Sequence, residues 1–136
     1  MNNFCYDLAM ALIPGTIAGY YSGLLMAKVS KFNSLKFEAL RIVRSINFVG
    51  DSQITSVTRS DKVQDLHLIA SELLLLKHKK SGMKVLEISN EVLNAVAACE
   101  LAPYDVQLFG KQVASWQLRL RGIKPGARIL LPWGQI

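Results

Sequence analysis

The sequence has few residues of the kinds that build disulfide frameworks, zinc sites or disordered tails. It contains 2 cysteines and 2 histidines among 136 residues. Because these residues are scattered, the composition argues against a small disulfide-rich fold and against a structural zinc site. Charged residues make up only 19% of the chain and hydrophobic residues 51%, which excludes a disordered or linker segment. The length is enough for one domain with one core.

The sequence also lacks the local motifs of common enzymes. It has no phosphate-binding loop, no dinucleotide-binding glycine pattern, no zinc-protease motif and no nucleophile elbow. Two carboxylate pairs, Asp61 with Asp65 and Glu87 with Glu91, have the spacing that shares a helix face. Isolated pairs of this kind usually form a solvated surface. We therefore expect a non-enzymatic protein with no catalytic residue, no metal ion and no cofactor.

Basic residues are absent before Lys28, and the stretch from Leu8 to Ala27 contains no charge at all. At about 1.5 Å per residue, a helix of this length spans the roughly 30 Å hydrocarbon layer of a bilayer. Lys28, Lys31 and Lys36 follow it, and each gains about 1 kcal/mol beside anionic lipid. The charge asymmetry predicts an N-terminus outside and the rest in the cytoplasm.

The predicted organisation is a single-pass transmembrane segment over residues 1–29 of the inner (plasma) membrane and a cytoplasmic helical domain over residues 30–136. Two alternatives are a signal peptide, although MNNFCYD supplies no basic residue, and a buried helix of a soluble protein.

Small residues recur every four positions inside the apolar stretch. Such a pattern forms one smooth stripe, which lets two membrane helices approach closely. We therefore expect self-association through Ala11, Gly15, Gly19, Gly23 and Ala27. An alternative is that glycine is simply common in membrane helices. Thr16, Tyr20 and Tyr21 could line a narrow pore in an oligomer.

Four helical patterns follow, and the fold class is predicted to be all-α. Apolar residues at 3–4 spacing indicate helices over 32–49, from about Ser60 to Lys80, from Met83 to Glu100, and from Pro103 to Leu120. The first is expected to continue directly from the membrane helix. Lys77, Lys79, Lys80 and then Gly82 resemble a helix stop signal, and the Leu73–Leu76 run is expected at the centre of the core. Residues 51–60 are expected to be a loop or short turn with no hairpin, and the tail from Ile123 is expected to be irregular.

The basic residues of the predicted domain form two further clusters. One surrounds a helix junction and the other follows the last helix; they comprise Lys77, Lys79, Lys80 and Lys84, and Arg119, Arg121, Lys124 and Arg128. Either cluster could bind an anionic, nucleotide-like ligand, and an oligomer would concentrate their positive potential. The alternative is a solubilising surface. Because no DNA-reading motif is present and Trp116 belongs to an apolar stripe, sequence-specific DNA is not an expected partner.

Two resemblances bear on function. Arg59 and His67 are similar to the arginine–histidine pair of HEPN-type ribonucleases, which are helical bundles, although seven residues separate the pair here, a longer gap than is usual in that family. The overall architecture, a glycine-striped membrane helix before a compact basic domain, resembles small membrane-anchored effectors of bacterial CRISPR and other antiphage systems. That resemblance implies a cytoplasmic domain that responds to a nucleotide second messenger or a protein complex, and membrane helices that perturb the membrane.

Three hypotheses follow. The first is an oligomeric membrane protein whose cytoplasmic bundle binds a partner or anionic ligand and controls the membrane segment. The second is a passive anchor that recruits a cytoplasmic protein through its apolar stripes. The third is a membrane-tethered ribonuclease that uses Arg59 and His67.

Overall fold

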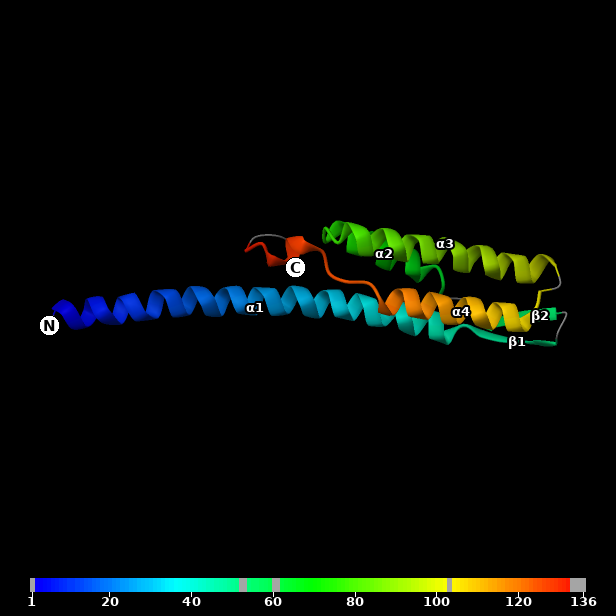
Figure 1. Cartoon of the computed structure of the whole chain (residues 1–136), viewed down its shortest axis with the longest axis horizontal. Helices are drawn as coiled ribbons and strands as arrows, with labels where there is room; N and C mark the ends of the chain where they lie inside the picture. Colours follow the sequence, from blue (N-terminus) through cyan, green and yellow to red (C-terminus); the bar gives the residue numbers. More distant parts are fainter. Residues whose placement is uncertain (1, 52–53, 60–61, 103, 133–136) are drawn as a thin grey trace.

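The protein is described by a computed structural model that covers residues 2–51, 54–59, 62–102 and 104–132. One helix, α1, runs from Asn2 to Ser45 and forms the long axis of the molecule (Figure 1). Its first half projects away from the rest of the protein, and its second half carries the domain. The all-α class predicted from the sequence is confirmed, and so is the direct continuation of the uncharged stretch into the first helix of the domain.

The domain is built from two packed layers of helices. Helices α2 (Asp65–Leu75) and α3 (Lys79–Leu101) form an antiparallel hairpin, and α4 (Val106–Arg121) lies along the second half of α1 (Figure 1). A short 3-10 helix, η1 (Ala127–Leu130), returns to the middle of α1. Residues 127–130 therefore lie beside the part of α1 that emerges from the domain.

The core lies between the layers and is formed by the apolar stripes that the sequence predicts. The buried residues include Phe32, Leu35, Ala39, Ile42, Val43 and Ile46 of α1, Leu66, Ala70 and Leu73 of α2, Val85, Ile88, Val92 and Val96 of α3, and Phe109, Val113, Trp116 and Leu120 of α4. The ring of Phe109 packs edge-on against the rings of Tyr104 and Trp116. Because the stripes face each other, the domain uses its own apolar seams to form its core.

The end of α2 differs from the prediction. The helix stops at Leu75 rather than near Lys80, because Lys77 adopts a left-handed conformation with φ 68°. The amides of Lys77 and His78 then bond back to the carbonyls of Leu74 (3.0 Å) and Leu73 (2.9 Å), the two bonds of a Schellman motif. Glycine usually occupies this left-handed position. Because a lysine occupies it here, the sequence gives no signal that the helix ends. Only part of the Leu73–Leu76 run lies in the core: Leu73 is fully buried, whereas Leu75 is 65% exposed.

Gly82 does not end a helix but lies inside α3, where α2 crosses closest to it. A Cβ at this position would lie 2.7 Å from Leu74 Cγ and 3.1 Å from the Leu74 amide nitrogen. The glycine is therefore explained by the close approach of two helices, rather than by a stop signal.

The segment expected to be a loop forms a β-hairpin instead. Strands β1 (Asn47–Asp51) and β2 (Ile54–Arg59) pair antiparallel, with Phe48 opposite Val57, and the hairpin lies against α3 and α4. The β-branched residues of β2 suit a strand, but their serine and threonine neighbours suggested a turn. Val49, expected on the first helical stripe, belongs to β1, because α1 ends at Ser45.

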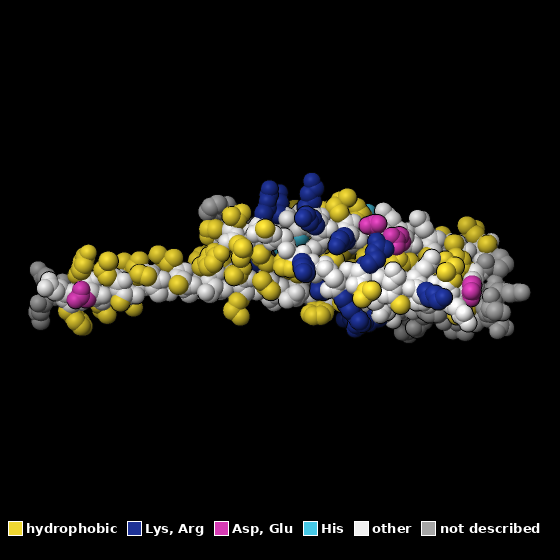
Figure 2. Space-filling model, in the orientation of Figure 1, with side chains coloured by type: hydrophobic (Ala, Val, Ile, Leu, Met, Phe, Trp, Pro, Cys, Tyr) yellow, Lys and Arg dark blue, Asp and Glu magenta, His cyan; other side chains and the backbone are white. Residues whose placement is uncertain are grey.

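The N-terminal half of α1 is apolar and uncovered. The helix is long and apolar enough to cross a membrane, with a mean hydropathy of 1.4 in its most apolar window and none of that window buried. Figure 2 shows its hydrophobic side chains on both visible edges of the projecting rod. Phe4 and Tyr20, near the two ends of this rod, are 71% and 72% exposed.

Candidate functional site: a basic cleft at the α2–α3 turn

The structure brings most of the two basic sequence clusters together around one cleft. Its volume is about 670 Å³, and it lies between the α2–α3 turn and the segment that follows α4. We call it the basic cleft; its lining residues are Lys77, His78, Lys79, Lys80, Ser81, Lys84, Gly122, Ile123, Lys124, Pro125, Gly126, Ala127 and Arg128. None of these residues is acidic. In the described part of the cleft, no carboxylate therefore offsets the charge of the lysines and the arginine.

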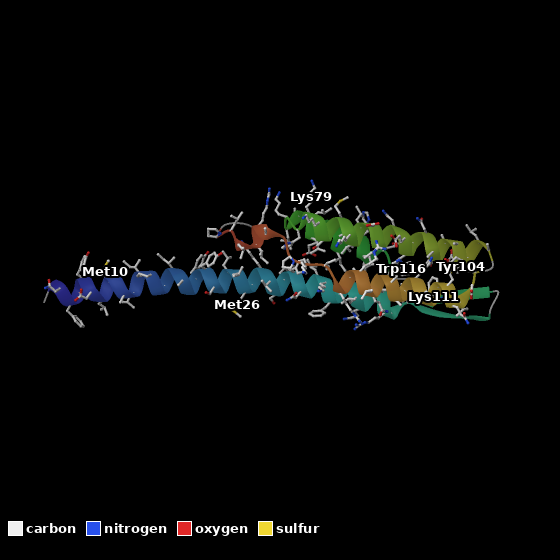
Figure 3. All side chains as sticks on the ribbon, in the orientation of Figure 1. Met10, Met26, Lys79, Tyr104, Lys111 and Trp116 are labelled. Carbon is white, nitrogen blue, oxygen red and sulfur yellow. The ribbon has the colours of Figure 1, made fainter. Side chains whose placement is uncertain are left out.

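One wall of the basic cleft is the start of helix α3. Lys79, Lys80 and Ser81 form its first turn, in which backbone N–H groups lack partners inside the helix. The positive end of the helix dipole adds to the lysine charges there. Figure 3 shows Lys79 pointing outward from this end of the domain. The wall therefore combines mobile ammonium groups with fixed amide donors, a combination suited to phosphate.

The opposite wall is the C-terminal segment, which we define as residues 122–132. Two hydrogen bonds join it to the first wall: the Ser81 hydroxyl donates to the Lys124 carbonyl, and the Gly126 amide donates to His78 Nδ1 at 2.9 Å. A Cβ on Gly126 would lie 3.4 Å from the Lys77 carbonyl oxygen. The two walls of the cleft are thus joined by hydrogen bonds between side chains and backbone.

The C-terminal segment is also bonded to α1. Lys36 Nζ donates to the Ile123 carbonyl at 3.3 Å, Lys28 Nζ donates to the Leu131 carbonyl at 2.8 Å, and the Tyr21 hydroxyl donates to the Leu130 carbonyl. Lys31, between the two lysines, forms an ion pair with Glu72 of α2 at 2.8 Å. The three lysines that follow the apolar stretch are therefore held by the protein itself.

Arg119 and Arg121 do not join the basic cleft. Arg119 forms ion pairs with Glu91 (2.7 Å) and Glu87 (3.4 Å) of α3, and Trp116 Nε1 donates to the same Glu91 oxygen at 2.9 Å. The hydrogen bond from Arg119 lowers the pKa of Glu91 and raises that of the arginine. The carboxylate pair Glu87 and Glu91 thus joins α3 to α4 through Arg119. Arg121 is exposed and is not among the residues that line the cleft.

The remaining sequence candidates are not among the residues that line the basic cleft. Arg59 is at the end of β2, and His67 is an exposed residue of α2, while Asp61 lies outside the described residues. Cys5 is exposed and Cys99 is half-buried, and both are free thiols; burial raises the pKa of Cys99. Within the described chain, no group of three or more His, Cys, Asp or Glu residues is placed to hold a metal ion.

His78 belongs to the first basic cluster of the sequence, but its buried role in the site was not predicted. It is only 5% exposed, and its ring packs edge-on against Phe32 of α1, with 4.9 Å between ring centroids. Burial lowers its pKa, so the neutral imidazole is favoured and Nδ1 can accept from Gly126. The sequence contains no signal for this contact, because it depends on a glycine far along the chain.

The stability of the domain should depend on the protonation of His78. Burial lowers the pKa of His78 in the folded state. The neutral imidazole therefore makes its full contribution to the free energy of unfolding above the unfolded pKa of about 6.5, and this contribution is lost as the pH falls below that value. We therefore expect the melting temperature to fall between pH 7 and pH 5. His78→Gln, whose amide oxygen can still accept from Gly126, should flatten this dependence in a thermal melt monitored by circular dichroism. His67→Gln, at an exposed histidine, should leave it unchanged; equal slopes in all three proteins would contradict the assignment.

No protein-family model, curated protein or solved structure matches this chain. Over the residues that the structure describes, the fold is that of an all-α protein with a helix long and apolar enough to span a membrane, and with a basic cleft between the α2–α3 turn and the segment after α4.

Proposed function

We propose that this chain is an oligomeric single-pass membrane protein whose basic cleft binds an anionic, phosphate-bearing ligand and thereby controls the membrane segment. One observation carries the proposal. The C-terminal segment forms a wall of the basic cleft and is hydrogen-bonded to α1 at Tyr21, Lys28 and Lys36. A ligand in the cleft therefore contacts the same segment that contacts the membrane helix.

The charge distribution supports an orientation with the domain in the cytoplasm. Every lysine and arginine follows Ala27, and Asp7 is the only charged residue before it. The positive-inside rule then assigns the domain to the cytoplasmic side of the plasma membrane and the N-terminus to the outside. Phosphate-bearing metabolites and anionic headgroups are both accessible from that side.

The geometry of α1 supports self-association. Counted at about 100° per residue, the buried Lys28, Phe32 and Leu35 lie on the face opposite Gly19. The domain thus packs on one face of α1 and leaves the glycine face open: a Cβ on Gly15, Gly19 or Gly23 would meet no atom within 4 Å.

Two larger side chains lie on the same open face. Met26 is 73% exposed and points away from η1 in Figure 3, and Phe37, further along, is 64% exposed. A second α1 can therefore approach along this face without displacing the domain, and the contact would extend from the glycines to Phe37.

Control would operate through a change in the C-terminal segment. A ligand shifts an equilibrium only by its different affinity for two states. Binding that draws Lys124 and Arg128 toward Lys79 and Lys80 would move the segment that holds Tyr21 and Lys28. The resemblance to membrane-anchored antiphage effectors extends the proposal to a nucleotide messenger as ligand and to membrane perturbation, including a pore, as the output.

The passive-anchor alternative is less well supported. It requires apolar stripes that are free to recruit a partner, whereas Phe109, Trp116 and Leu120 of the predicted seam are buried in the domain's own core. The basic cleft, by contrast, is open and positively charged, so we place the binding function there.

The test is charge reversal in the cleft. Full-length protein in phosphatidylcholine nanodiscs would be titrated calorimetrically with pyrophosphate and with ATP. The double variant Lys80→Glu/Lys124→Glu should bind at least about 100-fold more weakly, because each of the two lost charge-assisted hydrogen bonds costs about 1.5–3 kcal/mol. Lys111→Glu, an exposed lysine of α4 outside the cleft lining, is the matched control and should bind normally.

A second arm separates a soluble ligand from a lipid headgroup. Native mass spectrometry would count phosphatidylglycerol molecules retained by the protein from mixed vesicles, for the same three proteins. If the parent protein retains phosphatidylglycerol and the double variant does not, the lipid is the source of the phosphate. If the parent protein binds pyrophosphate but retains no phosphatidylglycerol, the ligand is soluble. If neither probe binds, or if Lys111→Glu weakens binding equally, the cleft is not the site.

A further inference from the structure

We propose that the end of the C-terminal segment, residues 127–132, is embedded in the membrane interface beside α1, with Leu130 and Leu131 in contact with lipid. This inference rests on the membrane crossing of α1 in the proposed function. It adds a second membrane-contacting element, which the sequence analysis placed in the cytoplasmic domain.

The position of the segment along α1 is the first argument. The carbonyls of Leu130 and Leu131 accept from Tyr21 and Lys28, so the segment lies level with the last two turns of the uncharged stretch. Tyr21 precedes Ala27 by about 9 Å of helix at 1.5 Å per residue. A bilayer that reaches Ala27 would therefore surround residues 129–131, and one that ends at the Tyr20–Tyr21 pair would have them at its surface. In both cases the segment lies in the interface.

The hydrogen bonding of the segment is the second argument. Irregular backbone is tolerated at membrane depth only where its polar groups are paired. The Leu130 and Leu131 carbonyls are paired with side chains of α1, and the amides of Ile129 and Leu131 donate to the Gly126 and Arg128 carbonyls at 3.1 Å. Lys28 is only 7% exposed, and its ammonium group is directed to a carbonyl. The backbone that approaches the membrane is thus already supplied with partners.

The character of the exposed surface is the third argument. Leu130 is 58% exposed and Leu131 is 39% exposed. Figure 2 shows a hydrophobic shoulder of the domain next to the projecting rod, with basic side chains gathered beyond it. The apolar surface of the segment is therefore continuous with that of the membrane helix, and Arg128 stands at its polar edge. An apolar face bordered by long cations is typical of an element that lies in a lipid interface.

The consequence is that the basic cleft faces the membrane surface. Arg128 lines the cleft two residues before Leu130, so insertion of the leucines brings the cleft lysines to the level of the headgroups. Lysine and arginine there gain from anionic lipid.

Spin labels at single cysteines would test the depth. In full-length protein with Cys5→Ser and Cys99→Ala, reconstituted in phosphatidylcholine vesicles, labels at Leu130→Cys and Leu131→Cys are compared with three references. A label at Ile17→Cys reports a position inside the span, and a label at Tyr20→Cys reports the depth expected for the segment. A label at Leu118→Cys reports the aqueous side, because Leu118 on α4 is 70% exposed. Collision of each label with oxygen and with a water-soluble nickel complex would be measured by electron paramagnetic resonance.

We expect the nickel accessibility at Leu130 and Leu131 to be several-fold lower than at Leu118 and close to that at Tyr20. Tyr21→Phe, which removes the hydrogen bond to Leu130, should raise it. If Leu130 and Leu131 resemble Leu118 while Ile17 is deep, the segment lies in water and this inference is wrong. If Ile17 is itself accessible to nickel, the membrane crossing fails instead, so the two failures are distinguishable.

Discussion

Gly19→Ile is expected to convert the assembled protein into a monomer. A Cβ at Gly19 would contact nothing within 4 Å in the protomer, so the substitution leaves the fold of a single chain undisturbed. In an oligomer that packs through the glycine face, however, a branched side chain would hold the two helices apart and remove their close contacts. Native mass spectrometry in mild detergent should show a defined oligomer for the parent protein and a monomer for the variant.

Ile17→Phe is the matched control for this result. Ile17 is 63% exposed and lies on the opposite side of α1 from Gly19, so added bulk there should leave the oligomer intact. If Gly19→Ile assembles as fully as the parent protein, the glycine face is not the contact. If both variants are monomeric, assembly uses the whole surface of the span rather than one stripe.

Gly82→Val is expected to cause the largest loss of stability. Any Cβ at this position falls 2.7 Å from Leu74 Cγ and 2.8 Å from Leu74 Cδ2, closer than real contacts allow. The added side chain would therefore push α2 from α3 at their turn, and overpacking of this kind costs about 3 kcal/mol. For a small domain, this lowers the melting temperature by about 10–20 °C. Circular dichroism of the full-length protein in detergent would measure it.

Two further variants show whether the cause is the contact with Leu74. Leu74→Ala removes the obstructing atoms, so the double variant should lose less stability than the sum of the two single changes. Gly122→Ala is the control glycine, because its Cβ would lie 3.5 Å from its nearest neighbour, the Arg119 carbonyl, an ordinary contact. Gly122→Ala should melt close to the parent protein; an equal loss at both glycines would contradict the close-approach explanation.

The elements that depend on local pattern were predictable. The uncharged stretch before Lys28 indicated a long helix, and 3–4 spacing indicated the buried faces of the four helices, down to Phe109, Val113 and Trp116. Gly122 ends α4 as expected, but the helix begins at Val106 rather than at Pro103, which lies outside the described residues. Its cap is Asp105, whose side chain accepts from the Gln107 amide at 3.0 Å.

The candidate site was only half predictable. Both basic clusters were visible in the sequence, but nothing local indicated that Lys84 and Lys124 line the same cleft, or that Arg119 is taken by two glutamates of α3. The break at Lys77 was missed because a left-handed lysine has no sequence signature, and the hairpin was missed because its stabilising neighbours, α3 and α4, come later in the chain.

Four features follow from local sequence: the helical class, the apolar length of α1, the glycine stripe and the amount of basic charge. Each of these is a property of residues a few positions apart, which a helix brings to one face whatever the rest of the chain does. Three other features appear only in the folded chain: α2 turns at Lys77, the stripe stays open, and the chain returns to bond Tyr21 and Lys28. Those features depend on contacts between distant segments, where packing and hydrogen-bond satisfaction override local preference.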